Sequence, residues 1–286
     1  MSTTLLPSSN LERIREHLVG LKMARALEAL DTVVRQLEQG EIAALEAFDL
    51  LLGEELQMRE SRRIRMALMT ARLTRIKTLA TYDFSFQPSL DRNRVLALAQ
   101  LDFVARREVV HLLGPPGTGK THLAVALGVE AVKAGKSVFF GTLAEIIASL
   151  LKAEREGQVA QRIQFLMRPA LLIVDEVGYL PLAPGGANLF FQLVNARYER
   201  GAMILTSNRG FKEWGQVFGD NVVAAALLDR LLHHAVVIQI EGNSYRLREH
   251  AALLPEGLKR PTDAEATVPR RRPGRPRKEA LASSAG

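Results

Sequence analysis

The sequence predicts an α/β protein in which helices cover a parallel five-stranded sheet, with a small all-helical domain before it and a disordered basic tail after it. Three observations support this prediction. Between about 91 and 250, short apolar runs alternate with helical stretches, which is typical of parallel strands joined by helices. Residues 11 to 78 lack proline and repeat apolar side chains every three or four positions, a helical period. After about 255, large apolar residues almost vanish, so little burial offsets the entropy of ordering.

The boundaries of these parts follow from changes in pattern. The stretch TYDFSFQP, which ends at Pro88, interrupts the helical period of the first part, and a proline there indicates a linker. We therefore expect a helical N-terminal domain at 1–80, an α/β domain at 81–255 and a disordered basic tail at 256–286.

Composition excludes several classes of protein. A chain of 286 residues that is 47% hydrophobic and 24% charged can bury a sizeable core and is typical of a globular protein. It contains no cysteine, which excludes disulfides and thiolate zinc sites. The N-terminus does not resemble a signal peptide, and charged residues interrupt the most apolar late stretch. We expect a cytoplasmic protein without a membrane partner.

The net charge of +7 is unevenly distributed. The last thirty residues, 257–286, contain eight lysines and arginines and three acidic residues. The second basic stretch, 59–77, has seven basic residues and one acidic residue, Glu60. Such segments attract nucleic-acid phosphates, although a solvated helix is the simpler interpretation of 59–77.

The stretch GPPGTGKT, 114 to 121, lies between an apolar run, VVHLL, and a helical stretch, THLAVALGVEAVKAG. This is the strand-to-helix context of a phosphate-binding P-loop, whereas an ordinary Gly/Pro turn is the alternative. Glycines let successive N–H groups turn inward, and the helix start adds partial positive charge. We expect ATP to be bound by Gly114, Pro115, Pro116, Gly117, Thr118, Gly119, Lys120, Thr121 and His122.

Acidic and amide side chains follow two further apolar runs. Asp175 and Glu176 end the run ALLIV, and Asn208 ends the run AMILTS. At the carboxyl ends of parallel strands they can face the bound phosphates. We expect the Thr121 hydroxyl to bind Mg²⁺ and Asp175 to hold the ion through water. We also expect Glu176 to act as general base on the attacking water and Asn208 to orient that water. Solvated turns are the alternative for these residues.

Taken together, these motifs resemble the AAA+ ATPases, and more closely the IstB family of ATP-dependent helpers of insertion-sequence transposition. The closer likeness extends from about 80 to 250. The segments that carry it are DFSFQP (83–88), LLGPPGTGKTHLAVALG (112–128), LLIVDEVGYLPL (171–182), RYER (197–200), TSNRGFKEWGQVFGD (206–220), LLDRLLHHA (227–235) and NSYR (243–246). The DnaC-type loaders of replicative helicases share several of these elements. The resemblance implies that the α/β domain is an AAA+ ATPase domain.

The resemblance also implies roles for two arginines. Arg230, in LLDR, resembles the arginine finger that one subunit offers to the γ-phosphate bound by its neighbour, and Arg246, in SYR, resembles the second sensor, which contacts nucleotide within its own subunit. A guanidinium can spread charge over the transferring phosphoryl group, although a surface ion pair is the alternative for each. A finger supplied by a neighbour implies a homo-oligomer that forms with ATP and DNA.

Three segments are candidates for contact with double-stranded DNA, and the basic stretch 59–77 is the first of them. The segment GTLAEIIASLLKAEREG resembles a helix that lines the DNA path in the initiator and loader branch of AAA+ proteins, and a plain amphipathic helix is the alternative. The tail stretch RRRPGRPRK resembles an AT-hook, with Pro273 in place of the usual first arginine. The candidate DNA-binding residues are Arg62, Arg63, Arg65, Lys152, Arg155, Arg271, Arg272, Arg275 and Arg277.

Of the functions that these features allow, we expect an oligomeric ATPase that binds and remodels DNA and recruits or activates a cognate transposase. A helicase loader of the DnaC type has the same chemistry with a different partner. A small-molecule kinase fits less well, because the DE and TSN motifs are suited to attack by water. A non-hydrolysing DNA-architectural protein would not need the ATPase set. A partner-binding module built on the N-terminal helices is the remaining alternative.

Overall fold

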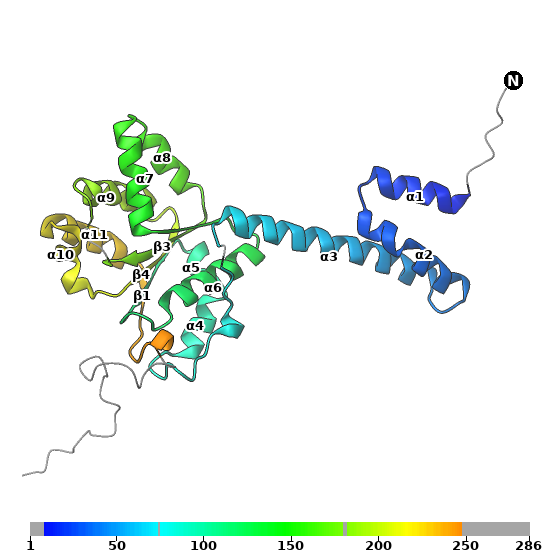
Figure 1. Ribbon diagram of the computed structural model, residues 1–286, viewed down its shortest axis with the longest axis horizontal. Coiled ribbons are helices and arrows are strands. Elements are labelled where there is room, and N and C mark those ends of the chain that lie inside the picture. Colours follow the sequence, from blue (N-terminus) through cyan, green and yellow to red (C-terminus); the bar gives the residue numbers. More distant parts are fainter. Residues whose placement is uncertain (1–8, 74, 180–181, 248–286) are drawn as a thin grey trace, which may run out of the picture. The chain divides into compact units, whose positions relative to one another are not determined.

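The computed structural model describes residues 9–73, 75–179 and 182–247 of the protein (Figure 1). Met1–Tyr245 forms one compact unit, and Arg246–Gly286 forms a second unit. The expected disordered tail, 256–286, lies outside the described residues. The domain boundaries that we expect at 80 and 255 stay predictions.

Helices account for the first part of the chain, as the sequence predicts. They are α1 (Asn10–Gly20), α2 (Ala24–Glu38) and α3 (Ala44–Thr70). Ser9 caps α1 with a reciprocal capping box. The Ser9 hydroxyl accepts a hydrogen bond from the Glu12 N–H, and the Glu12 carboxylate accepts one from the Ser9 N–H. Such a cap satisfies two helix-end donors. Leu18 and Leu30 are buried at the centre of a small cluster that the three helices share.

The sheet has five strands, and every pairing in it is parallel. The strands are β1 (Val109–Leu113), β2 (Val138–Thr142), β3 (Leu171–Val177), β4 (Ala202–Ser207) and β5 (Ala235–Gln239). Their order is β2-β3-β4-β1-β5. The five apolar runs of the sequence are these strands, which confirms the predicted α/β class and the five-stranded parallel sheet.

Helices cover both faces of this sheet (Figure 1). One face packs against α4 (Arg92–Leu98), α5 (Asp102–Ala105) and α6 (Lys120–Lys133), and the other against α7 (Leu143–Arg155), α8 (Val159–Met167), α9 (Gly186–Arg197), α10 (Trp214–Phe218) and α11 (Asn221–Leu232). Two short 3₁₀ turns, Leu79–Thr81 and Phe211–Glu213, complete the described elements. Successive side chains of β3 point to opposite faces of the sheet. Ile173 packs in the core on the first face, and Leu172 and Val174 pack in the core on the second. Strands buried on both faces account for continuous apolar runs in the sequence.

The end of α3 and the residues that follow it belong to the first of these cores. Leu68, Ala71 and Leu73 are buried in the same cluster as residues of β1, β3 and α6. The Phe140 N–H, on β2, donates to the Ala71 carbonyl at 2.9 Å.

Within the described residues, every helix is too short or too polar to serve as a membrane span.

Candidate active site

The candidate site lies where the carboxyl ends of three neighbouring strands meet. The loop at 114–119 follows β1, and Asp175 and Glu176 lie near the carboxyl end of β3. Asn208 follows β4, which lies between those two strands. Because all strands are parallel, these ends share one edge of the sheet. The structure therefore brings together the P-loop and the polar residues that the sequence predicts there.

Two other segments pack against the P-loop, one at Tyr82 and one at Ser244 and Tyr245. The glycines of the loop leave space for them. Gly117 has φ +81° and lies against Ser244, and Gly119 has φ +93° and would place a Cβ 2.7 Å from the Tyr82 ring. L side chains rarely adopt such angles. Tyr82 donates its hydroxyl to the Thr118 carbonyl at 3.2 Å, and the Tyr245 N–H donates to the Gly117 carbonyl at 3.0 Å. The loop is thus held from both sides.

Lys120 is the first residue of α6, and its side chain is buried against the loop that it follows. Its ammonium donates to the carbonyl oxygens of Gly114 and Pro115, at 2.7 Å each. The positive charge therefore lies inside the curve of the loop, next to a helix start that carries partial positive charge of its own. This arrangement favours a bound phosphate group.

A connected set of hydroxyl and carboxylate groups lies beside Lys120. Thr121 donates its hydroxyl to Asp175 Oδ1 at 2.9 Å, and Thr206 donates its hydroxyl to the same oxygen. Asp175 is 3% exposed. Mg²⁺ prefers oxygen ligands and usually keeps several waters. The Thr121 hydroxyl is such a ligand, and the Asp175 carboxylate that it contacts can hold a metal-bound water, so these residues fit the ion.

Glu176 has an unusual backbone for a residue at a strand end. Its φ is +61°, in the left-handed region, and the β3–β4 register shifts between Val174 and Val177. Such a bulge redirects the side chains around it, and Glu176 is exposed between two buried neighbours. Its N–H donates to the Thr206 hydroxyl at 3.0 Å. Strained backbone of this kind is typical of functional sites.

Glu176 also lines a hollow with α7. The cavity has a volume of ≈ 220 Å³ and an otherwise largely apolar lining, which includes Ile147, Leu151, Tyr179 and Leu182. Because Glu176 is itself exposed, its carboxylate is accessible to an attacking water.

Asn208 directly follows β4, and Ser207 anchors the turn there. The Ser207 hydroxyl contacts the carbonyls of Val177 and Arg209 at 2.8 and 2.9 Å. Among the described residues, none donates to the buried Asn208 Oδ1. A buried acceptor of this kind is costly, and a bound water would satisfy it.

Thr206 is the residue that sequence reasoning missed. Its hydroxyl connects Asp175 to the Glu176 backbone, so it positions both acidic residues of the site. The signal for it in the sequence is a hydroxyl residue near the end of the apolar run AMILTS, two positions before Asn208.

The His122 side chain contacts the segment before the α/β core. Its Nε2 lies 3.0 Å from the Thr78 carbonyl and 3.3 Å from the Thr81 hydroxyl, and its ring packs edge-on against Tyr82. The side chain therefore ties α6 to the segment that precedes the α/β core. Only the backbone N–H of His122, in the first turn of α6, remains as its predicted contribution to phosphate binding.

Arg230 lies on α11 and is held by residues of α9 and by Tyr198, which directly follows α9. Its Nε donates to Asn195 Oδ1 at 2.7 Å, and its guanidinium lies over the rings of Phe191 and Tyr198, at 5.5 and 5.6 Å from their centroids. Arg230 precedes β5, at the amino-terminal edge of the sheet, whereas the P-loop lies at the carboxyl edge. The structure does not bring Arg230 to the P-loop of its own chain.

The remaining predicted residues are Arg246 and the candidate DNA-binding residues. Arg246 is exposed and belongs to the second compact unit, so its sensor role stays a prediction. Arg62, Arg63 and Arg65 are exposed on α3, and Lys152 and Arg155 are exposed in the last turn of α7. The tail residues Arg271, Arg272, Arg275 and Arg277 lie outside the described part of the chain.

Comparisons with known proteins give a consistent relationship. A family model described as IstB-like ATP binding protein matches residues 16–252. The ATP-binding protein of insertion sequence IS21 from Pseudomonas aeruginosa is 48% identical over 229 residues, which are 80% of this chain and 86% of that one. Its counterpart of IS5376 from Geobacillus stearothermophilus is 40% identical over 238 residues, 83% of this chain and 95% of that one. AMPPCP-bound DnaA from Aquifex aeolicus is similar in structure, with a TM-score of 0.48 and 23% identity over 62% of this chain and 54% of that one.

Proposed function

The chain belongs to the family of IstB-like ATP-binding proteins, and we propose that it is the ATP-dependent helper of a DNA transposase. It is an ATPase of the AAA+ fold. In this proposal it binds double-stranded DNA, assembles on it with ATP as a homo-oligomer, remodels the DNA, and recruits or activates its cognate transposase. The observation that carries the chemistry is the chain of contacts from Thr121 through Asp175 and Thr206 to Glu176, next to Lys120.

The residues of the site divide the reaction between them. Lys120 and the N–H groups of the loop bind the β- and γ-phosphates. Thr121 and Asp175 would hold Mg²⁺, which neutralises phosphate charge when it is bound with ATP. Glu176 accepts a proton from the attacking water while Asn208 orients it. The water oxygen bonds to the γ-phosphorus, the bond from that phosphorus to the bridging oxygen breaks, and ADP and phosphate leave.

The place of Arg230 supports hydrolysis at contacts between subunits. Its guanidinium lies near the amino-terminal edge of the sheet and is held by Asn195, Phe191 and Tyr198. An arginine held at that edge can reach a γ-phosphate only if the phosphate belongs to another molecule. We therefore propose that Arg230 serves the site of a neighbouring subunit, which makes ATP turnover depend on assembly.

Two basic segments support contact with DNA. Arg62, Arg63 and Arg65 are exposed on α3, and the tail at 257–286 contains eight basic residues. Lysine and arginine side chains bind DNA phosphates whatever the base sequence of the DNA. Lys152 and Arg155 are weaker candidates, because Glu154 and Glu156 flank them and Lys152 lies 3.9 Å from the Glu156 carboxylate.

ATP hydrolysis by the full chain, measured alone, with duplex DNA, and with duplex DNA and the cognate transposase, tests this function. We expect duplex DNA to stimulate turnover and the transposase to join the assembly on DNA. If a replicative helicase joins it and the transposase does not, the chain is a helicase loader. Turnover that requires a small-molecule phosphate acceptor would contradict both interpretations.

A further inference from the structure

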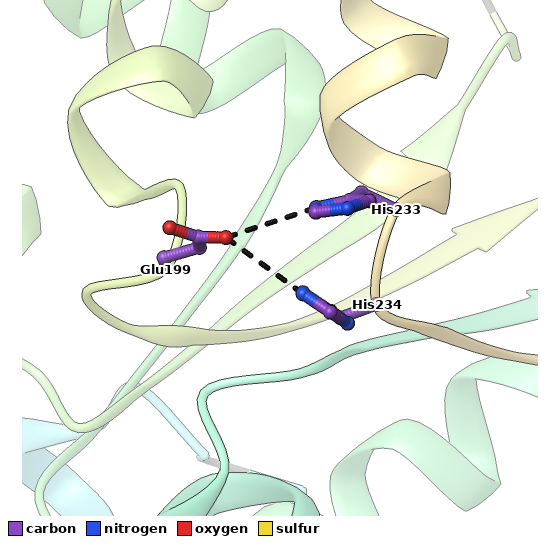
Figure 2. Close-up of side chains that lie close together, drawn as sticks. All are labelled: Glu199, His233 and His234. Carbon is purple, nitrogen blue, oxygen red and sulfur yellow. Dashed lines mark ion pairs between the residues drawn. The ribbon is translucent and has the colours of Figure 1, made fainter.

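A group of metal-ligating side chains lies at the edge of the sheet opposite the P-loop. Glu199 is in the turn between α9 and β4, and His233 and His234 are in the connection between α11 and β5. Figure 2 shows the Glu199 carboxylate directed toward both imidazole rings. We propose that these three residues form a binding site for a divalent transition-metal ion of the Zn²⁺ type.

The distances among the three donor atoms are suitable for one ion. Glu199 Oε1 lies 3.7 Å from His233 Nδ1 and 3.7 Å from His234 Nε2, and all three atoms lie within 4.8 Å of one another. Ligands of tetrahedral Zn²⁺ with bonds of about 2.0–2.1 Å lie about 3.4 Å apart. The side chains are exposed, so small rotations are enough to close the remaining gap.

The ligand chemistry favours zinc and similar ions over Mg²⁺. Two imidazole nitrogens and one carboxylate oxygen are a common donor set for Zn²⁺, and they leave a fourth position for water. Mg²⁺ prefers oxygen ligands. The chain has no cysteine, so no thiolate site competes for the ion.

The backbone holds Glu199 in position. Glu199 has φ +56°, a left-handed conformation that is uncommon for a residue other than glycine. Arg107 donates from Nη1 to the Glu199 carbonyl oxygen at 3.1 Å. These two features fix the turn from which the carboxylate reaches the histidines. The carboxylate is therefore already close to both histidines before an ion binds.

Tyr198 competes with the ion for one ligand. Its hydroxyl lies 2.7 Å from His233 Nδ1, the nitrogen that faces Glu199. A metal bound at Nδ1 requires that this hydrogen bond be given up. Removal of the hydroxyl alone, by Tyr198→Phe, should therefore tighten metal binding by about fivefold, the equivalent of one ordinary hydrogen bond.

Calorimetric titration of Zn²⁺ into the full chain, without nucleotide and with excess Mg²⁺ to occupy oxygen sites, tests the proposal. The wild-type chain should bind one more equivalent of Zn²⁺ than a His233→Ala/His234→Ala double variant. Glu199→Gln should weaken this equivalent by more than about tenfold. His17→Ala, which removes an exposed histidine of α1, is the matched control and should bind as wild type does.

Equal Zn²⁺ binding by the wild-type chain and the double variant would overturn the proposal, and so would an unchanged or lower affinity in Tyr198→Phe. Visible absorption of bound Co²⁺ gives a second measurement, because its spectrum should be lost in the same variants. ATP binding by each variant, at the other edge of the sheet, shows that the variant is folded. Since the titration contains no nucleotide, its result is independent of whether the proposed role in transposition is correct.

Discussion

At the scale of single residues, the hydroxyl of Thr206 is the group on which the geometry of the site depends. It donates to Asp175 Oδ1 and accepts from the Glu176 N–H. Thr206→Val keeps the shape and removes both contacts. We expect ATP binding to change little and kcat to fall by about tenfold, in proportion to one or two lost hydrogen bonds.

Steady-state kinetics and nucleotide-binding titrations measure the two quantities separately. Thr70→Val is the matched control, because Thr70 is an exposed residue of α3 whose hydroxyl donates to the Met66 carbonyl in the same helix. A kcat for Thr206→Val equal to that of the control would show that Thr206 does not position the acidic residues.

Lys120 and Glu176 should separate binding from chemistry. Lys120 meets phosphates in the ground state, whereas Glu176 acts on water only during reaction. We therefore expect Lys120→Ala to lose ATP binding and Glu176→Gln to keep it while losing hydrolysis. Fluorescent-nucleotide binding and phosphate release measure the two effects. Wild-type turnover by Glu176→Gln would mean that another group is the general base.

Much of the site could be predicted from the sequence because its motifs are local. The loop from Gly114 to Thr121 can be recognised from the strand before it and the helix after it. Acidic residues at the end of a buried strand must lie at the carboxyl edge of a parallel sheet. The bulge that gives Glu176 its left-handed backbone depends on pairing with β4, which no local pattern specifies. The contacts of Thr206 depend on that same pairing.

At the scale of elements, His111 joins β1 to the end of α11. Its ring is buried, and its Nε2 hydrogen bonds the Leu231 carbonyl at 3.0 Å. Burial lowers the pKa of His111 to about 4, an effect that the bond to Leu231 only partly opposes. As the pH falls, the unfolded chain, with a histidine pKa of about 6.5, takes up the proton first. The contribution of His111 to stability is therefore full above pH 6.5 and is lost as the pH falls toward 4.

Urea unfolding between pH 8 and pH 4 tests this prediction. His111→Gln keeps a donor for Leu231 but does not titrate in this range. The stability of the wild-type chain relative to that of the variant should fall by up to about 3 kcal/mol across the interval. A difference that stays constant with pH would show that His111 is not buried as the neutral form.

Elements that are far apart in the sequence account for what could not be predicted. Glu199 is separated from His233 and His234 by β4, α10 and α11, and none of the three belongs to a metal-binding spacing motif. Only the parallel pairing of β4 and β5 with β1 places their starts at one edge of the sheet. The five strands could be predicted from apolar runs in the sequence, whereas their order in the sheet could not.

At the scale of the whole molecule, the two basic segments should make different contributions to DNA binding. Deletion of 257–286 should weaken affinity for duplex DNA and flatten its salt dependence, since each lost phosphate contact removes close to one unit of slope. Assembly with ATP should survive. Changing Arg62, Arg63 and Arg65 to glutamine should instead impair assembly on DNA.

A salt titration of duplex binding for the wild-type chain, the truncation and the triple variant measures these effects. An unchanged slope after truncation would show that the tail does not touch DNA. A triple variant that assembles normally would show that Arg62, Arg63 and Arg65 form only a solvated face of α3.

The central claim is that ATP is hydrolysed between subunits, with Arg230 of one molecule acting on nucleotide held by Lys120 of another. Arg230→Ala alone should still bind ATP and should lose turnover in the assembly by a factor on the order of 10³. Lys120→Ala alone should be inactive because it does not bind nucleotide.

The most direct test is to mix Arg230→Ala with Lys120→Ala, two inactive variants, on duplex DNA. The account predicts that turnover reappears, because some contacts then pair an intact P-loop with an intact arginine. Labelled subunits and energy transfer show whether the two variants occupy the same oligomer. If mixed oligomers form and ATP turnover stays at the level of the separate variants, the claim that Arg230 acts between subunits is wrong.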